Sequence, residues 1–156
     1  MTQTEEQDLL QLQNFLTYRL ARVQARLNAQ AVRLLKETAG INLSQWRVIA
    51  MIGSGGDDTV LAADLKRIMG FDKGLFSRTV RGLMADGLVT SVVDERDQRC
   101  QRLALTNSGR ALYNSTLPVM RARQERLQDA LDADELVALL SGLDKLETAA
   151  SAGGHA

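Results

Sequence analysis

The sequence has little of what most enzymes and metalloproteins use for chemistry. Its 156 residues include one cysteine and one histidine. A single cysteine excludes an internal disulfide and fits a reducing compartment, so we expect a cytoplasmic protein. The histidine, His155, stands alone, which leaves no Ser/His/Asp arrangement and no histidine-based metal cluster. The composition therefore argues against an enzyme, a metal site and a bound cofactor.

Long apolar runs and a net charge are also absent. No stretch approaches the roughly 18 apolar residues that cross a bilayer, and the first residues are acidic, unlike a secretory signal, so we expect no membrane partner. Basic and acidic side chains are equal at 19 each. Residues 61–110 nevertheless hold nine basic and six acidic side chains, whereas residues 111–156 hold four and seven. A neutral chain can thus present a basic surface to nucleic acid.

Apolar residues spaced by three and four positions predict helical structure at the beginning of the chain. The pattern runs over residues 9–34, as one helix or as two helices joined near Asn28, and Gly40 ends it. A further helix follows, with Ser44 as the expected N-cap, and should stop by Gly53. The first third of the chain is therefore expected to be helical.

The last third of the chain is also expected to be helical. Thr106 can cap a helix, and Pro118 should kink or briefly interrupt it. Asp132 followed by Glu135 matches a capping box at the start of a final helix, whose leucines fall on one face. Residues 151–156 are small and polar and are expected to form a flexible tail.

The middle of the chain predicts two short helices followed by a β-hairpin. The helices cover residues 61–69 and 72–85, with Asp72 as the N-cap of the second. Residues 88–93 and 101–106 are apolar and β-branched and bracket a charged tip, which is typical of a hairpin. Four side chains of the second helix are expected to point inward: Phe76, Val80, Leu83 and Met84.

A helix-turn-helix unit followed by a hairpin is the outline of a winged helix. The fold class we predict is mainly α: a winged helix-turn-helix with a two-stranded β-hairpin wing, and a helical region built from both ends of the chain. At 156 residues, the chain has the length of one domain.

The face of the second short helix opposite its apolar stripe carries long donors and small residues. Arg78 and Arg81 can reach base edges or phosphates in a major groove, while Gly74 adds no bulk where the backbone approaches DNA. The alternative is an ordinary solvated basic face. The candidate DNA-binding residues of this helix are Lys73, Gly74, Leu75, Ser77, Arg78 and Arg81, with Leu75 exposed for contact with a thymine methyl.

The charged hairpin tip adds a second candidate contact. Arg99 can enter the minor groove, where the potential of DNA is most negative, and Asp97 can hold its guanidinium in position. The alternative is a solvated turn whose exposed ion pairs contribute little energy. The hairpin context favours the DNA-binding interpretation.

Several short motifs, taken in order, resemble a known family. Together with a long first helix, they are similar to the MarR family of bacterial transcriptional regulators. Their order and spacing cover nearly the whole chain. The motifs are LSQWRV at 43–48, SRTV at 77–80, GLV at 87–89, DQR at 97–99, LTNSGR at 105–110 and LDADEL at 131–136.

The resemblance implies a homodimer. Residues 1–156 would form a single domain, in which 1–40 and 107–150 are dimerisation helices and 41–106 the winged helix-turn-helix region that binds DNA. Two-fold symmetry then implies a pseudo-palindromic operator in double-stranded DNA, with half-sites about one helical turn, roughly 10 bp, apart. The recognition helix would be residues 72–85.

The resemblance also implies a function. Members of the family are mostly repressors, which a small aromatic or phenolic acid, or oxidation, releases from DNA. By family position Arg99 is the wing arginine and Asp97 its orienting acid, as the residues themselves indicate. We therefore expect a sequence-specific DNA-binding transcriptional regulator that acts as a ligand-responsive repressor.

Aromatic residues near the start of the chain are candidates for an effector site. Phe15, Tyr18 and Arg22 form a second stripe on the first helix, and Trp46 lies on the following element. A ring together with an arginine can hold an aromatic carboxylate. The alternative is that Phe15 and Trp46 are core residues and that Arg22 makes an ion pair.

Cys100 leaves a redox-responsive regulator as an alternative. The neighbouring Arg99 and Arg102 can lower the pKa of its thiol. By resemblance, however, peroxide-sensing members have a reactive cysteine near the start of the chain, where this sequence has none. An incidental, partly buried cysteine that is dispensable for function is the simpler interpretation.

A winged-helix dimer that binds another protein is the alternative from a different functional class. Protein-contact surfaces favour aromatic anchors over unpaired basic side chains. The residues that favour DNA over a protein partner are Ser77, Arg78, Arg81 and Arg99.

Overall fold

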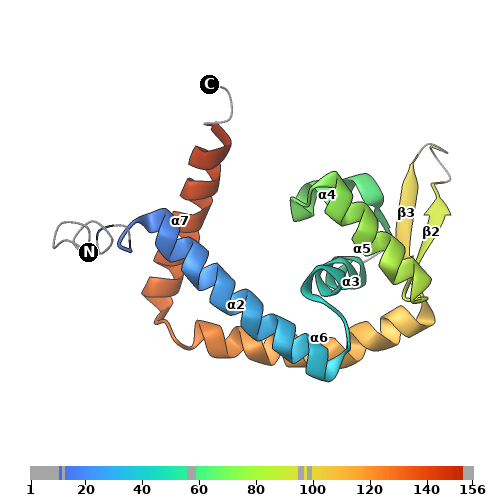
Figure 1. The fold of residues 1–156 in the computed structure, drawn as a ribbon, viewed down its shortest axis with the longest axis horizontal. Coiled ribbons are helices and arrows are strands. Elements are labelled where there is room, and N and C mark those ends of the chain that lie inside the picture. Colours follow the sequence, from blue (N-terminus) through green and yellow to red (C-terminus); the bar gives the residue numbers. More distant parts are fainter. Residues whose placement is uncertain (1–10, 12, 56–58, 95–96, 98–99, 153–156) are drawn as a thin grey trace, which may run out of the picture. The chain divides into compact units, whose positions relative to one another are not determined.

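The computed structural model describes residues 11, 13–55, 59–94, 97 and 100–152 (Figure 1). It is mostly helical with one small sheet, which confirms the predicted class. The helix α6 crosses the boundary between two compact units, Met1–Thr116 and Leu117–Ala156. The elements are α2 (Leu16–Thr38), α3 (Leu43–Ser54), β1 (Thr59–Leu61), α4 (Ala62–Met69), α5 (Lys73–Ala85), β2 (Val89–Val93), β3 (Gln101–Leu105), α6 (Asn107–Gln128) and α7 (Ala133–Ala152).

The helix α2 is continuous from Leu16 onward. It runs through Asn28, so the alternative of two helices joined there is wrong. The interruption lies earlier, in a turn where the Asn14 amide donates to the Gln11 carbonyl at 3.0 Å. At the other end, Gly40 has a φ of 66°, which favours glycine and ends the helical region as predicted. The first part of the predicted pattern, residues 9 and 10, lies outside the described residues.

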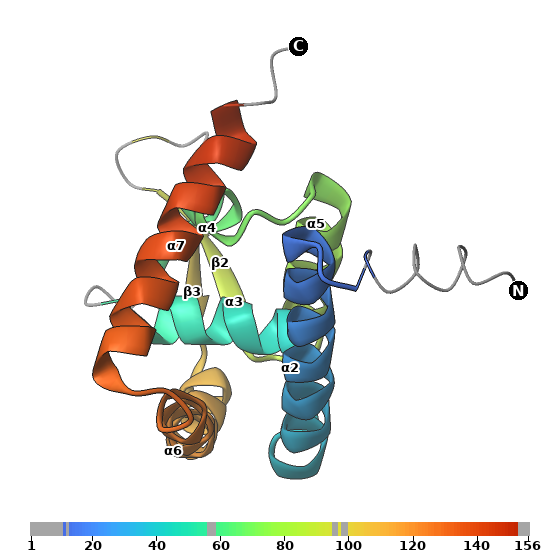
Figure 2. The ribbon, with the colours of Figure 1, turned by 90° about the vertical axis from the view of Figure 1, so that its left-hand side faces the viewer.

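The helix α3 begins at Leu43, and its N-cap is Asn42 instead of the predicted Ser44. The Asn42 side chain accepts a hydrogen bond from the Gln45 amide at 2.9 Å, and the Gln45 side chain accepts one from the Asn42 amide at 3.0 Å. This reciprocal pair satisfies two amides that a cap at Ser44 would leave unpaired. The helix continues one residue past Gly53 and runs crosswise to α2 (Figure 2).

The helix-turn-helix unit forms as predicted, from α4 and α5. Gly70, with a φ of 61°, makes the turn between them. The inward face of α5 holds three of the four predicted side chains, but Met84 is 42% exposed and Thr79 is buried instead. With about 3.6 residues per turn, Thr79 lies nearer than Met84 to the centre of the face formed by Phe76, Val80 and Leu83.

The wing contains three strands, where two were predicted. The hairpin of β2 and β3 is confirmed, and β1 pairs with the other side of β3 in the order β1-β3-β2. Val60 and Ser91 flank Leu103, which is fully buried in the central strand. A strand of three residues has too short an alternation to be detected in the sequence, which is why β1 was missed.

A tight corner joins the wing to α6. The Thr106 hydroxyl donates to the Gly87 carbonyl at 2.6 Å and accepts from the Gly109 amide at 3.0 Å, so the predicted cap is confirmed. The Thr106 amide donates to the Leu88 carbonyl at 3.1 Å. A Cβ built on Gly109 would overlap that carbonyl oxygen. The first turn of α6 therefore lies against the turn that follows α5.

The second unit consists of the end of α6 and α7. The helix α6 continues past Pro118 as one long helix, so of the two predicted outcomes, a kink or a brief interruption, the interruption does not occur. Asp132 and Glu135 form the predicted capping box, with hydrogen bonds of 2.8 and 2.9 Å. No residue of α7 is buried, and several of its large apolar side chains are exposed: Val137, Leu139, Leu140 and Leu143. In the part of the chain that is described, no helix is both long and apolar enough to cross a bilayer.

We predict that Gly109→Ala destabilises the protein by about 1–3 kcal/mol, because α6 must move away from the Leu88 carbonyl to make room for a methyl group. Urea unfolding followed by circular dichroism, at fixed protein concentration, measures the change in the free energy of unfolding.

The matched control is Gly142→Ala in α7, where a Cβ meets no atom within 4 Å. This substitution should leave stability unchanged or raise it by about 0.5–1 kcal/mol, since alanine is the better helix former. Equal effects of the two substitutions would contradict the close approach at Gly109.

Candidate nucleic-acid interface

One face of α5 is exposed and basic. Lys73, Arg78 and Arg81 are all exposed on it, together with Gly74. The Asp72 side chain accepts from the Leu75 amide at 2.8 Å and fixes the start of the helix at Lys73, as predicted. The structure thus exposes four of the six candidate residues of this helix: Lys73, Gly74, Arg78 and Arg81.

Two of these residues are less exposed than the sequence pattern indicated. Leu75 is half-buried, so the expectation that it is exposed is wrong. Ser77 is also half-buried, and its carbonyl accepts from the Arg81 Nε at 3.4 Å. This hydrogen bond draws the Arg81 guanidinium back along the helix, one turn toward its beginning.

Gly74 provides space for a neighbouring guanidinium. A Cβ built on Gly74 would lie 3.1 Å from the Arg78 Nη1 and 3.2 Å from the Asp72 Oδ1. A Cβ at this position would require the side chains of Arg78 and Asp72 to shift by a few tenths of an ångström. Among the described residues, no carboxylate lies within ion-pairing distance of Arg78 or Lys73, so both cations are available to a ligand.

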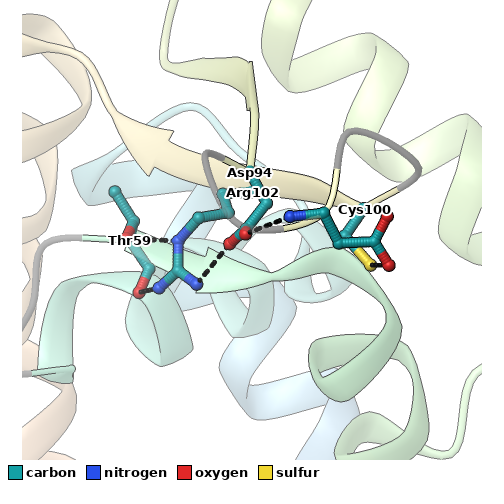
Figure 3. A network of polar contacts seen from close by, with 5 residues as sticks. Thr59, Asp94, Cys100 and Arg102 are labelled. Carbon is teal, nitrogen blue, oxygen red and sulfur yellow. Dashed lines mark hydrogen bonds and ion pairs between the residues drawn. The ribbon is translucent and has the colours of Figure 1, made fainter.

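The base of the wing holds an ion pair that the sequence analysis missed (Figure 3). Arg102, on β3, donates from Nη1 to the Asp94 Oδ2 at 3.1 Å and from Nε to the Thr59 Oγ1 at 2.9 Å. The hairpin register was the available signal. Val92 pairs with Arg102, so Asp94, two residues on, lies diagonally across the same face.

The predicted pair of Asp97 and Arg99 is described only in part, because Arg99 lies outside the described residues. Asp97 is exposed, and its amide donates to the Asp94 Oδ1 at 3.1 Å. Its carbonyl accepts from the Cys100 amide at 2.8 Å, and its Oδ2 accepts from the Cys100 thiol at 3.6 Å. The described residues of the wing tip, Asp94, Asp97 and Cys100, are thus joined by hydrogen bonds.

The surroundings of Cys100 do not activate its thiol. Desolvation, the hydrogen bond to Asp97 and the negative charges of Asp97 and Asp94 raise the pKa of Cys100. The expectation that neighbouring arginines lower this pKa is thus wrong: Arg102 is paired with Asp94 instead. Since the thiolate is the reactive form, the local chemistry disfavours oxidation sensing.

A pocket of about 290 Å³ lies on α3 and α4 and is lined by Trp46, Arg47, Ala50, Met51, Ile68 and Met69. Of the four predicted effector residues, only Trp46 lines it. The other three, Phe15, Tyr18 and Arg22, are exposed on α2. Trp46 is 6% exposed and stacks on Tyr113, with ring centroids 6.1 Å apart.

Arg47 supplies the charge at this pocket, and sequence reasoning did not single it out. Its Nη2 donates to the Asn28 Oδ1 at 3.5 Å. Its position next to Trp46 in the chain was the available signal. In the part of the chain that the structure describes, no cluster of three histidine, cysteine or acidic side chains is suited to a metal ion.

Comparisons with known proteins match this arrangement. The model of the MarR family matches residues 39–99. The chain is 32% identical to a MarR-family transcriptional regulator from Silicibacter pomeroyi, with 86% of this chain and 89% of that chain covered and a TM-score of 0.68. It therefore belongs to the MarR family, whose members are DNA-binding transcriptional regulators and not enzymes. No curated protein matches the sequence.

Two further solved structures are similar. A mutant MarR from Escherichia coli, complexed with operator DNA, is 26% identical, with 82% of this chain and 93% of that chain covered and a TM-score of 0.65. BpsR from Bordetella bronchiseptica, whose DNA binding is regulated by 6-hydroxynicotinic acid, is 21% identical. There the coverage is 86% of this chain and 94% of that chain, and the TM-score is 0.76.

We predict that Asp97→Asn makes the Cys100 thiol react severalfold faster with an aromatic disulfide near neutral pH. The substitution removes a negative charge and one of the two accepting oxygens beside the thiol, both of which raise its pKa, so more thiolate is present at a given pH. The absorbance of the released thiol reports the rate. Asp134→Asn, an exposed change on α7, serves as the control, and equal rates in both variants would contradict the assignment.

Proposed function

We propose that this protein is a homodimeric repressor that binds a pseudo-palindromic operator and is released by a small aromatic acid. The observation that carries the DNA-binding part is the exposed basic face of α5, where Lys73 and Arg78 have no carboxylate partner among the described residues. A regulator of this kind acts on the chromosome, and we therefore expect it in the cytoplasm.

The side chains of α5 and of the wing contact different parts of the DNA. In this proposal Arg78 and Ser77 read base edges in the major groove, and Lys73 and Arg81 contact bases or phosphates. Gly74 permits close approach of the helix to DNA. Arg99 enters the minor groove, oriented by Asp97.

A second copy of the chain would cover the exposed apolar side chains of the terminal helices. In α7, Val137 is 68% exposed and Leu140 is 53% exposed, and in α2, Val23 is 52% exposed. Large apolar side chains that are exposed in the single chain are typical of a protein contact. Residues 1–40 and 107–150 would supply this dimer interface, and two-fold symmetry would set the half-site spacing at about 10 bp.

The pocket on α3 and α4 is the best-supported effector site. At about 290 Å³ it is near the lower end of ligand pockets and suits a single aromatic ring. Arg47 is placed to bind a carboxylate and Trp46 to contact the ring. The similarity to BpsR, which an aromatic acid regulates, supports this class of effector. Phe15, Tyr18 and Arg22 would take part only if a second copy completes the site.

The direct test is a fluorescence-anisotropy titration of the protein against DNA upstream of its own gene and a scrambled duplex of equal length, at two salt concentrations. We expect much tighter binding to the first duplex and a steep fall in affinity with salt. Hydroxylated aromatic carboxylic acids should then release the DNA. If the protein binds both duplexes equally weakly, and binds sequences selected from a random pool no more tightly, the result would favour a protein partner instead of DNA.

We predict that Arg78→Ala weakens operator binding by about 1–3 kcal/mol and relaxes sequence preference, because a base contact is lost. Lys73→Ala should weaken binding to all sequences alike and reduce the salt dependence, because a phosphate contact is lost. The same titration measures both. Lys145→Ala, an exposed change on α7, should bind as the wild type does. Equal loss of specificity in both interface variants would mean that their roles are misassigned.

We predict that Leu140→Glu converts the dimer into a folded monomer, since a charge would be buried in the interface at a side chain that is 53% exposed in the single chain. Analytical ultracentrifugation at micromolar concentration measures the mass. Ala138→Glu, which introduces the same charge about 160° round α7 from Leu140, should remain dimeric. An unchanged mass for Leu140→Glu would exclude this face of α7 from the interface.

A further inference from the structure

We propose that Arg102 is a positioning residue for DNA binding, which orients the wing tip through Asp94 without contacting DNA itself. The inference rests on the proposed function, because it assigns a role within the same DNA-binding surface. What supports it is the unusual number of bonds that one guanidinium makes at the base of the wing.

The Arg102 guanidinium joins β1 to the end of β2. Its Nε and Nη2 donate to the Thr59 hydroxyl and carbonyl, at 2.9 and 3.4 Å, and its Nη1 donates to the Asp94 Oδ2 at 3.1 Å (Figure 3). The Arg102 and Asp94 side chains are 28% and 13% exposed. A part-buried, charge-assisted pair of this kind holds its geometry better than an exposed surface pair.

Asp94 links Arg102 to two further residues of the wing, Asp97 and Cys100. Its second oxygen, Oδ1, accepts from the Asp97 amide at 3.1 Å, while its own amide donates to the Cys100 carbonyl at 2.9 Å. The Cys100 amide in turn donates to the Asp97 carbonyl at 2.8 Å. One carboxylate therefore stands between Arg102 and the residues at the tip.

The strand β1 connects the restraint to the helix-turn-helix unit. Thr59 begins β1, which ends at Leu61, and α4 starts at the next residue, Ala62. With no loop between β1 and α4, the bonds to Thr59 tie Arg102, and through it Asp94, to the helix-turn-helix unit. A guanidinium suits this position because its planar fork can bond to two partners at once, which a lysine ammonium does not reproduce.

Asp94→Asn separates positioning from simple electrostatics. The change removes a negative charge from a DNA-binding surface, so charge alone predicts tighter binding. Positioning predicts the opposite, because Asp94 accepts through both of its oxygens, and in asparagine one of them becomes an NH2 group that would face a donor of Arg102 or the Asp97 amide. We expect operator affinity to fall roughly tenfold in the anisotropy titration, while affinity for the scrambled duplex falls less than about twofold.

Arg102→Lys provides a second, independent variant that keeps the charge of the wing. We expect a similar loss of operator affinity for Arg102→Lys. In double-mutant cycles, neither Asp94→Asn nor Arg102→Lys should add to the effect of Arg99→Ala, because all three substitutions disturb the same contact between the wing tip and DNA. The control is Asp64→Asn, which removes an acid from an exposed pair with Arg67 on α4. It should bind the operator as tightly as the wild type or slightly more tightly.

The outcomes separate this inference from the proposed function. Suppose that the wild type binds the operator more tightly than the scrambled duplex. If Asp94→Asn or Arg102→Lys then binds the operator as tightly as the wild type does, the positioning role is overturned and the proposed function is not. Additive losses with Arg99→Ala would also overturn it. A wild type that binds no DNA specifically would overturn the proposed function and this inference with it. Urea unfolding of each variant verifies that the losses arise in folded protein.

Discussion

The close approach of α6 to the turn after α5 is the constraint on which the arrangement of the first unit depends. Thr106 donates hydrogen bonds to the Gly87 and Leu88 carbonyls of that turn. Gly109 has no side chain, which leaves room for the Leu88 carbonyl. The end of α5, the last strand of the wing and the start of α6 meet there. A small displacement at this corner would therefore move α5 and the wing relative to each other.

Sequence reasoning located the elements well because their ends are set by local chemistry. Asp72, Thr106 and Asp132 cap helices with bonds to residues three positions away, which are visible in the sequence. It was wrong where two nearby residues could each be the N-cap of a helix, as Ser44 and Asn42 could at the start of α3. It also missed β1, whose pairing with β3 spans more than forty positions and has no local signature.

The candidate DNA-binding face was predictable for the same reason, since helical periodicity alone places Lys73, Arg78 and Arg81 together. The ion pair of Arg102 and Asp94 was not, because a charged tip rich in both signs allows several pairings until the strand register is known. The pocket residue Arg47 was missed because the pocket forms only where α3 meets α4.

The stack of Trp46 on Tyr113 gives the protein a built-in optical reporter. Trp46 is the only tryptophan in the chain, so its fluorescence comes from one site. That indole is buried, yet it lines the pocket proposed for the effector. Occupancy of the pocket changes the surroundings of the indole, whereas unfolding exposes it to water and shifts its emission to longer wavelength. One unlabelled spectroscopic signal can thus follow both ligand binding and the integrity of the fold.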